Sequence, residues 1–245
     1  MSKNVQPSSL GLRRIKLLEG LAPARLEALA RDCAWRNYDA GQGIISRHAK
    51  DRDVYLLVSG RVRVTTYSAA GRQVTFQDVA AGEIFGEVAA IDEMPRSADV
   101  VALEPALLAA MSPALFRRLL REEPVLGERV LKRLAGLVRR LSERVIDLST
   151  LGVQNRIHAE ILRLARAAGV AGNAARIEPA PKHADIAGQV STYREQVTRE
   201  LSALARRGVL AKDGAALIVR DVARLEKLVV QCAETRAARG AEPGA

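Results

Sequence analysis

One short segment, FGEVAAIDEMPRSADVV at residues 85–101, places three side chains with binding chemistry among apolar neighbours. Glu87 follows a glycine, and nine residues later Arg96 is followed by Ser97. A carboxylate can accept a hydrogen bond from a hydroxyl group, and an arginine with a serine can bind a phosphate. The segment therefore predicts a pocket for a ligand with hydroxyls at one end and a phosphate at the other. A surface turn with Glu87 and Arg96 as a solvated ion pair is the alternative.

A cyclic nucleotide has both features, because its ribose carries a 2′-hydroxyl and its cyclic phosphate carries one negative charge. The segment resembles the phosphate-binding cassette of cyclic-nucleotide-binding domains, in which a Gly-Glu pair and a short helical turn precede Arg-Ser/Thr/Ala-Ala. The resemblance implies that Glu87 binds the ribose hydroxyl and that Arg96 and Ser97 hold the phosphate. The site residues implied in this segment are Gly86, Glu87, Val88, Arg96, Ser97 and Ala98.

Recognition of the base depends on a different part of the chain. In bacterial members of that family, hydroxyl residues of a long helix cap the adenine. Counting back from Arg156, which resembles a fixed Arg-Ile after this helix, places Ser142 at one such position. The neighbouring position, usually a threonine, is Leu141. This departure leaves cAMP, cGMP and a less specific pocket open, and an ordinary exposed serine is equally compatible with Ser142.

A second group of polar residues occurs in STYREQVTREL, residues 191–201. A helix-turn-helix places its second helix in the major groove, where arginine can bind guanine and glutamate can accept from cytosine. The R-E-x-x-x-R arrangement resembles the recognition helix of the Crp-like branch of the Crp–Fnr family, which implies a TGTGA-type half-site. A solvated helix face with salt bridges is the alternative. The DNA-binding residues implied by the resemblance are Arg194, Glu195, Gln196, Thr198 and Arg199.

The spacing of apolar residues predicts the helices and strands that must position these side chains. Residues 10–35 predict one or two short helices, with Pro23 suited to a helix start. From about residue 36, short β-rich runs separated by glycines favour an all-β sandwich or barrel. Residues 97–111 predict two strands broken near Pro105, and Ser112 then opens a short helix as its N-cap.

Residues 125–150 predict a long helix with an apolar heptad seam. The seam residues step by three or four along the chain and are Leu134, Val138, Leu141, Val145 and Leu148. A two-helix dimer contact and an amphipathic helix packed on its own barrel both remain possible. Beyond it, residues 157–169 predict a helix, 171–181 a loop, and 183–207 two helices joined by a turn around Ser191, before a hairpin at Asp213–Gly214.

Composition bounds the class of protein. The net charge of +10 and the pI near 10.2 favour a polyanionic partner without locating its site. The two cysteines and three histidines are scattered, so no disulfide scaffold, iron–sulfur cluster or metal site is expected. The absence of a signal-peptide pattern and of long apolar runs predicts a soluble cytoplasmic protein without membrane contact. Enzyme activity is not expected, because no nucleophile–base set is visible.

Together, the cassette, the heptad helix and the R-E-x-x-x-R helix identify the chain as a member of the Crp–Fnr family over roughly residues 12–230. The expected fold is α+β: an N-terminal β-roll (a double-stranded β-helix) over 1–124, a dimerisation helix over 125–152, a winged helix-turn-helix over 153–236 and a disordered tail over 237–245. The resemblance implies a homodimeric, allosteric transcription regulator. Its effector would be cAMP or cGMP, and its partners double-stranded DNA and RNA polymerase. A same-fold regulator with a silent pocket or another effector, and a regulatory subunit of a partner enzyme, are the alternatives.

Overall fold

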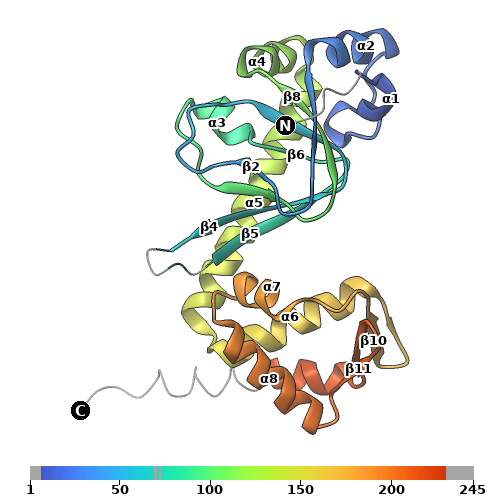
Figure 1. Ribbon diagram of the computed structural model, residues 1–245, viewed down its shortest axis with the longest axis vertical. Helices are drawn as coiled ribbons and strands as arrows, with labels where there is room; N and C mark the ends of the chain where they lie inside the picture. Colours follow the sequence, from blue (N-terminus) through green and yellow to red (C-terminus); the bar gives the residue numbers. More distant parts are fainter. Residues whose placement is uncertain (1–6, 69–70, 72, 230–245) are drawn as a thin grey trace, which may run out of the picture. The chain divides into compact units, whose positions relative to one another are not determined.

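The computed structural model describes residues 7–68, 71 and 73–229. The predicted tail at 237–245 lies outside these residues. The described chain forms two compact units, the first ending at Leu137 and the second beginning at Val138. Both units contain helices and strands, which agrees with the expected α+β class (Figure 1). None of the helices formed by described residues is long and apolar enough to cross a membrane.

The first unit is a β-roll with helices on one side. Its strands are β1 (Ala34–Tyr38), β2 (Gly43–Ile45), β3 (Val54–Ser59), β4 (Arg61–Tyr67), β5 (Gln73–Ala80), β6 (Ile84–Phe85), β7 (Asp99–Ala102) and β8 (Ala106–Met111). Its helices are α1 (Ser9–Leu12), the 3₁₀ helix η1 (Lys16–Leu18), α2 (Pro23–Asp32), α3 (Glu87–Asp92), α4 (Pro113–Glu122) and the first half of α5 (Pro124–Thr150).

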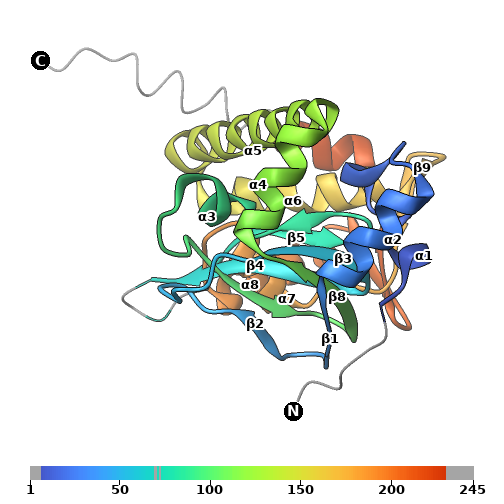
Figure 2. The same cartoon turned by 90° about the horizontal axis from the view of Figure 1, so that it is seen from above.

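Two four-stranded sheets make the roll, in the orders β1-β8-β3-β6 and β2-β7-β4-β5. Strand β3 is buried along almost its whole length because it packs on both faces. Val54, Leu56 and Val58 belong to the core shared with the helices, whereas Tyr55 and Leu57 belong to the core between the sheets. Figure 2 shows α2 near β3 and β8, and buried residues of α1 and α2 share the first of these cores. Successive side chains of β3 point to opposite faces of the sheet, so the strand contributes to both cores.

Several sequence-based boundaries are confirmed in this unit. Pro23 is the first residue of α2, and the hydroxyl of Ser112 caps α4 by accepting from the backbone N–H of Leu115 at 3.2 Å. The break near Pro105 separates β7 from β8. Gly60 joins β3 to β4 with a φ of 88°, which an L-residue rarely adopts. The expected all-β sandwich is therefore present, with the helices packed against its outer face.

The second unit is a winged helix-turn-helix. Its elements after α5 are α6 (Val153–Ala168), β9 (Val170–Ala171), β10 (Ala174–Ile177), α7 (His183–Gln189), α8 (Arg194–Arg206), β11 (Leu210–Asp213) and β12 (Ala216–Val219). The sheet has the order β11-β12-β10-β9, and Gly214 forms the tip of the β11–β12 hairpin. The two helices and the hairpin were predicted from the sequence and are confirmed.

The loop predicted for residues 171–181 is wrong over its first part. Residues 174–177 form β10, which pairs antiparallel with β12 through Ala175 opposite Val219 and Ile177 opposite Leu217. The Gly/Ala/Pro-rich composition concealed this strand. Its register depends on a partner about forty residues later in the chain, and local periodicity over four residues does not reveal such a partner.

Candidate functional site

Arg96 lies deep in the cassette and is only 4% exposed. Its Nη1 donates to the Gly86 carbonyl at 3.0 Å, and its Nη2 donates to the Asp53 carbonyl at 2.8 Å and to the Asp51 carboxylate at 2.6 Å. The guanidinium carbon lies 5.8 Å from the centre of the Tyr55 ring. The buried Nε–H has no acceptor among the described residues. A buried donor without an acceptor costs about 1–3 kcal/mol, so this atom is suited to an anion that a ligand supplies.

Glu87, the first residue of α3, is also 4% exposed. Its carboxylate accepts from Arg133 Nε at 3.2 Å. Arg133, on α5, additionally donates to the Glu83 carboxylate at 2.7 Å and to the Ile84 carbonyl at 2.6 Å. Lys16 Nζ is 2.7 Å from the other oxygen of Glu83. Four alternating charges therefore run from Lys16 to Glu87, and they hold the Glu87 carboxylate in place.

The burial of Glu87 and Arg96 shows that the solvated surface ion pair is the wrong interpretation. Each of the two side chains has its own counterion, Arg133 for Glu87 and Asp51 for Arg96, and no ion pair joins them to each other in the described chain. A buried carboxylate and a buried guanidinium that are not paired with each other leave two separate binding chemistries in one cassette.

Gly86 connects the two binding residues. Its φ of 83° lies in the left-handed region, and it is the N-cap of α3. A Cβ at this position would lie 2.8 Å from Arg96 Nη1 and 2.9 Å from the Asp53 carbonyl. Only glycine therefore allows the backbone to turn into α3 while its carbonyl accepts from Arg96.

The other predicted cassette residues surround this pair. Ser97 is exposed, Val88 is half-buried and Ala98 is 9% exposed. Ser142 and Leu141 lie on the stretch of α5 that belongs to the second unit, and both are exposed. Their part in base recognition stays a prediction.

Sequence reasoning missed four residues of this site, namely Asp51, Asp53, Tyr55 and Arg133. Burial raises the pKa of the Asp53 carboxyl above its ordinary value, and the Asp51 charge raises it further. Burial, followed by the Asp51 charge, raises the pKa of Tyr55 to about 12. The two acids of KDRD before β3 and an arginine on the polar face of α5 were visible signals. Neither could be linked to the cassette before the fold was known.

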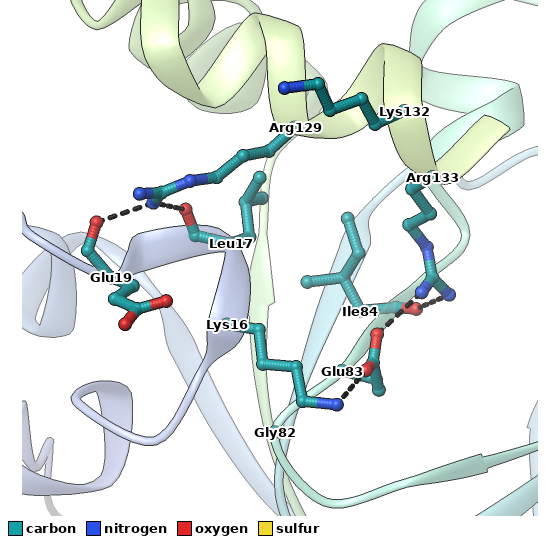
Figure 3. Close-up of a pocket in the computed structure, with 9 residues that line it drawn as sticks. All are labelled: Lys16, Leu17, Glu19, Gly82, Glu83, Ile84, Arg129, Lys132 and Arg133. Carbon is teal, nitrogen blue, oxygen red and sulfur yellow. Dashed lines mark hydrogen bonds and ion pairs between the residues drawn. The ribbon is translucent and has the colours of Figure 1, made fainter. Parts of the chain in front are cut away.

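A hollow of about 300 Å³ lies between η1, the residues before β6, and α5, and Arg133 is one of its lining residues. Figure 3 shows the side chains that line it. Its cations are already paired within the described chain. Lys16 contacts Glu83, Lys132 contacts Glu128 at 2.8 Å, and Arg129 donates to the Leu17 carbonyl at 2.9 Å. Arg129 and Arg133 therefore fasten α5 to the roll, and Lys132 pairs within α5 itself, so the hollow is lined by cations that already have partners.

The second candidate site is the exposed face of α8. Val197, Leu201 and Leu204 are buried on one face of this helix, as part of a core that also includes Ile186 and Val190. These residues form the interior between α7 and α8. The opposite face carries the exposed residues Arg194, Glu195, Thr198 and Arg199, whereas Gln196 is half-buried.

Several polar contacts hold α8 in position. The buried His158 of α6 lies with its Nε2 2.6 Å from Glu200, and Gln154 donates to the same carboxylate at 3.1 Å. His183 Nδ1 lies 2.7 Å from the Thr198 hydroxyl, and Gln196 pairs with Thr192. Thr198 and Gln196 thus take part in holding the helix pair together as well as facing outward.

The long side chains at the start of α8 are available for a partner. Arg194, Glu195 and Arg199 have no hydrogen bond or ion pair from their side chains within the described part of the chain. The salt bridges of the alternative interpretation are therefore not formed among these three side chains, but their exposure agrees with a solvated face as well as with base recognition, which stays a prediction. Two arginines, Arg144 of α5 and Arg156 of α6, fix the turn before α8 through the Gly188 carbonyl at 3.3 Å and the Val190 carbonyl at 3.0 Å.

Two protein-family models match the chain, the first over the cassette and the second over the helix pair α7 and α8. Residues 35–123 match the cyclic nucleotide-binding domain, and residues 155–228 match the Crp-like helix-turn-helix domain. The first match contains the cassette and the second contains α7 and α8.

Curated relatives match most of the chain. A "Cyclic AMP receptor protein" from Thermus thermophilus is 32% identical over 86% of this chain and 95% of its own. A "CRP-like cAMP-activated global transcriptional regulator" from Mycobacterium tuberculosis is 24% identical over 88% of this chain and 97% of its own. Among solved structures, a CooA variant from Carboxydothermus hydrogenoformans has a TM-score of 0.73 at 18% identity, covering 93% of this chain and 98% of its own. The last likeness shows the fold alone.

Proposed function

Because the chain belongs to the Crp–Fnr family of transcription regulators, we propose that it is a homodimer whose DNA binding is controlled by a cyclic nucleotide, with cAMP as the first candidate and cGMP as the second. The observation that carries this proposal is the unsatisfied Nε–H of the buried Arg96. A cyclic phosphate supplies the missing acceptor and the negative charge together. The names of the Thermus and Mycobacterium relatives favour cAMP.

In the proposed complex, each residue of the cassette has a defined task. The Glu87 carboxylate accepts from the ribose 2′-hydroxyl, while Arg133 orients that carboxylate by donating to it. Arg96 and Ser97 bind the phosphate, and the backbone beside Val88 and Ala98 closes the pocket. Ser142 contacts the base, and Leu141 in place of a threonine leaves cGMP as a competing effector.

The DNA-binding task falls to the exposed face of α8. Arg194, Glu195 and Arg199 are proposed to read the bases of a TGTGA-like half-site, with Gln196 and Thr198 beside them. A palindromic operator with half-sites about 34 Å apart would match two such helices related by a two-fold axis. RNA polymerase is the expected partner once the protein is bound to DNA.

The dimer contact is proposed to lie along α5. Four of its heptad residues are exposed in the single chain, and the exposures are 61% for Val138, 37% for Leu141, 62% for Val145 and 39% for Leu148. An apolar stripe with this repeat is suited to the same stripe of a second copy in a coiled coil. We therefore propose three functional parts of the chain. Residues 1–124 bind the cyclic nucleotide, residues 125–152 form the dimer helix, and residues 153–236 bind DNA.

Isothermal titration calorimetry of the full chain with cAMP and, in parallel, cGMP tests the proposal. We expect micromolar or tighter binding of one of them, and at least a hundredfold weaker binding by Arg96→Ala. A regulator with a silent pocket would give no heat with either nucleotide while still binding DNA. A regulatory subunit of an enzyme would bind nucleotide but would show no preference for a TGTGA-like duplex over a scrambled one.

A further inference from the structure

The solvent side of Arg96 is occupied by an acid from the loop before β3. Asp51 lies 2.6 Å from Arg96 Nη2, and its side chain is 43% exposed, whereas that of Arg96 is 3% exposed. Asp51 therefore stands between the buried guanidinium and solvent. An anion that reaches the free Nε–H must come to rest close to this carboxylate.

The charges around Arg96 are already balanced before any ligand arrives. The titratable and charged groups that act on this site are Asp51 and Asp53 on the loop before β3, Tyr55 on β3, and Arg36 and Tyr38 on β1. Arg36 and Arg96 supply two positive charges against the two aspartates. Tyr55 adds no charge at pH 7, because burial raises its pKa to about 12. Asp51 is the partner of Arg96 that reaches solvent, so an approaching anion meets its negative charge.

The repulsion from a fixed carboxylate grows in proportion to the charge of the incoming group. A cyclic phosphodiester carries one negative charge. A phosphomonoester such as 5′-AMP, which forms when water opens the cyclic phosphate, has a second pKa of about 6 and carries close to two charges at pH 7. Asp51 thus opposes the monoester about twice as strongly as the cyclic ester at the same position.

We propose that Asp51 is a specificity-determining residue, which restricts the cassette to singly charged phosphate esters and excludes nucleoside phosphomonoesters. This inference rests on the proposed function, because it concerns the ligand of the same site. The carboxylate keeps the buried Arg96 paired when the pocket is empty and penalises a doubly charged ligand when it is filled. The residue acts on the choice of ligand by its charge and not by its shape.

The test is competition of cAMP and of 5′-AMP against a fluorescent cyclic nucleotide bound to the full chain. The variants are Asp51→Asn, the charge-retaining Asp51→Glu and the control Asp39→Asn, which removes an exposed aspartate on another loop. We expect the affinity ratio of cAMP to 5′-AMP to fall at least tenfold in Asp51→Asn and to stay near that of the wild type in the other two. Thermal melting of each variant confirms that it is folded.

The pH supplies a second readout that a structural role of Asp51 would not change. Lowering the pH from 7.5 to 5.5 protonates 5′-AMP to the monoanion but leaves cAMP unchanged, because the monoester titrates near pH 6. The ratio should therefore fall in the wild type and stay nearly constant in Asp51→Asn. If the ratio of cAMP to 5′-AMP affinity in Asp51→Asn at pH 7.5 equals that of the wild type, including the case in which 5′-AMP binding stays unmeasurable in both, the charge filter alone is overturned. A wild-type chain that binds neither cAMP nor cGMP overturns the proposed function, and the filter with it.

Discussion

A buried charge is tolerated only where counterions and hydrogen-bond partners surround it. Glu87 and Arg96 meet this condition through residues far away in the sequence, Arg133 and Asp51. Within the described chain, the Nε–H of Arg96 has no acceptor, and Arg133 donates to one oxygen of Glu87. At the scale of single residues, we therefore expect the proposed pocket to be formed before a nucleotide enters.

Replacing Gly86 tests the close approach between backbone and guanidinium. In Gly86→Ala, the new Cβ would meet Arg96 Nη1 at 2.8 Å, so Arg96 must move and nucleotide affinity should fall at least tenfold in calorimetry. Gly41→Ala is the matched control, because Gly41 has the same φ of 83° with nothing within 4 Å of its Cβ. Both variants should lose about 1–3 kcal/mol of stability from the left-handed backbone, but only the first should lose affinity. Equal affinities in the two would contradict the role given to Gly86.

Replacing Arg133 tests how Glu87 is held. Arg133→Met leaves the Glu87 carboxylate buried without its cation, and a hydrogen bond to a charged group contributes about 1.5–3 kcal/mol. We expect cAMP to bind about tenfold more weakly. In the wild type, Glu87 should favour cAMP over 2′-deoxy-cAMP, because only cAMP has the 2′-hydroxyl that Glu87 would bind. This preference should disappear in Arg133→Met, because Glu87 is no longer held in position. Lys132→Met, which removes an exposed neighbouring cation, should preserve both properties. A 2′-hydroxyl preference that survives in Arg133→Met would show that Glu87 does not need this arginine.

Among the elements, α8 has one face that packs in the core and one exposed face that we propose for DNA recognition. One face is buried in the core of the second unit, and a second group of side chains ties the helix to α6 and α7. The remaining face, with Arg194, Glu195 and Arg199, contributes to neither. Charged side chains that are exposed, unpaired and positioned by a rigid helix are suited to base recognition.

Replacing Arg199 tests this division. Arg199→Ala should weaken binding to a TGTGA-like duplex by about 1–3 kcal/mol and relax the preference over a scrambled duplex, if the side chain reads a base. Arg206→Ala, at the other end of α8, removes the same charge and should weaken both duplexes to a similar and smaller extent. Fluorescence anisotropy at fixed salt measures both. A loss in Arg199→Ala that is equal on the two duplexes would assign the residue to phosphate contact instead.

On the scale of the whole molecule, α5 is the element that belongs to both units. Arg133, in the first unit, contacts Glu87, and Arg144, in the second, donates to the Gly188 carbonyl and the Ser191 hydroxyl beside the turn before α8. The two arginines are eleven residues apart on the same helix. If a ligand changes how Glu87 contacts Arg133, as we propose, α5 is the element that would transmit the change to the turn of the helix pair.

Thermodynamic linkage gives the prediction at this scale. If the nucleotide tightens operator binding, operator DNA must tighten nucleotide binding by the same factor, typically about 5–150-fold. Titration of cAMP with and without a saturating TGTGA-like duplex measures this factor, and Arg144→Met should reduce it while leaving nucleotide affinity in the absence of DNA unchanged. Identical nucleotide affinities with and without DNA would show that the two sites are independent.

The sequence by itself determined the order of the parts and the residue types of both sites. Gly86, Glu87 and Arg96 stand close together in the chain, and so do Arg194, Glu195 and Arg199, so short-range spacing was enough to predict them. The amphipathic period of the helices and the turn residues likewise predicted most element boundaries, because these depend on neighbours within a few residues.

Only the tertiary structure decided which partners complete the sites. Asp51 reaches Arg96 from 45 residues away and Arg133 reaches Glu87 from 46. The short β10 exists because β12 pairs with it. Such contacts depend on the packing of strands and helices that are distant in sequence, and no local pattern encodes them. The sequence therefore predicted the groups that would bind a ligand, whereas the fold supplied the counterions that hold these groups in place.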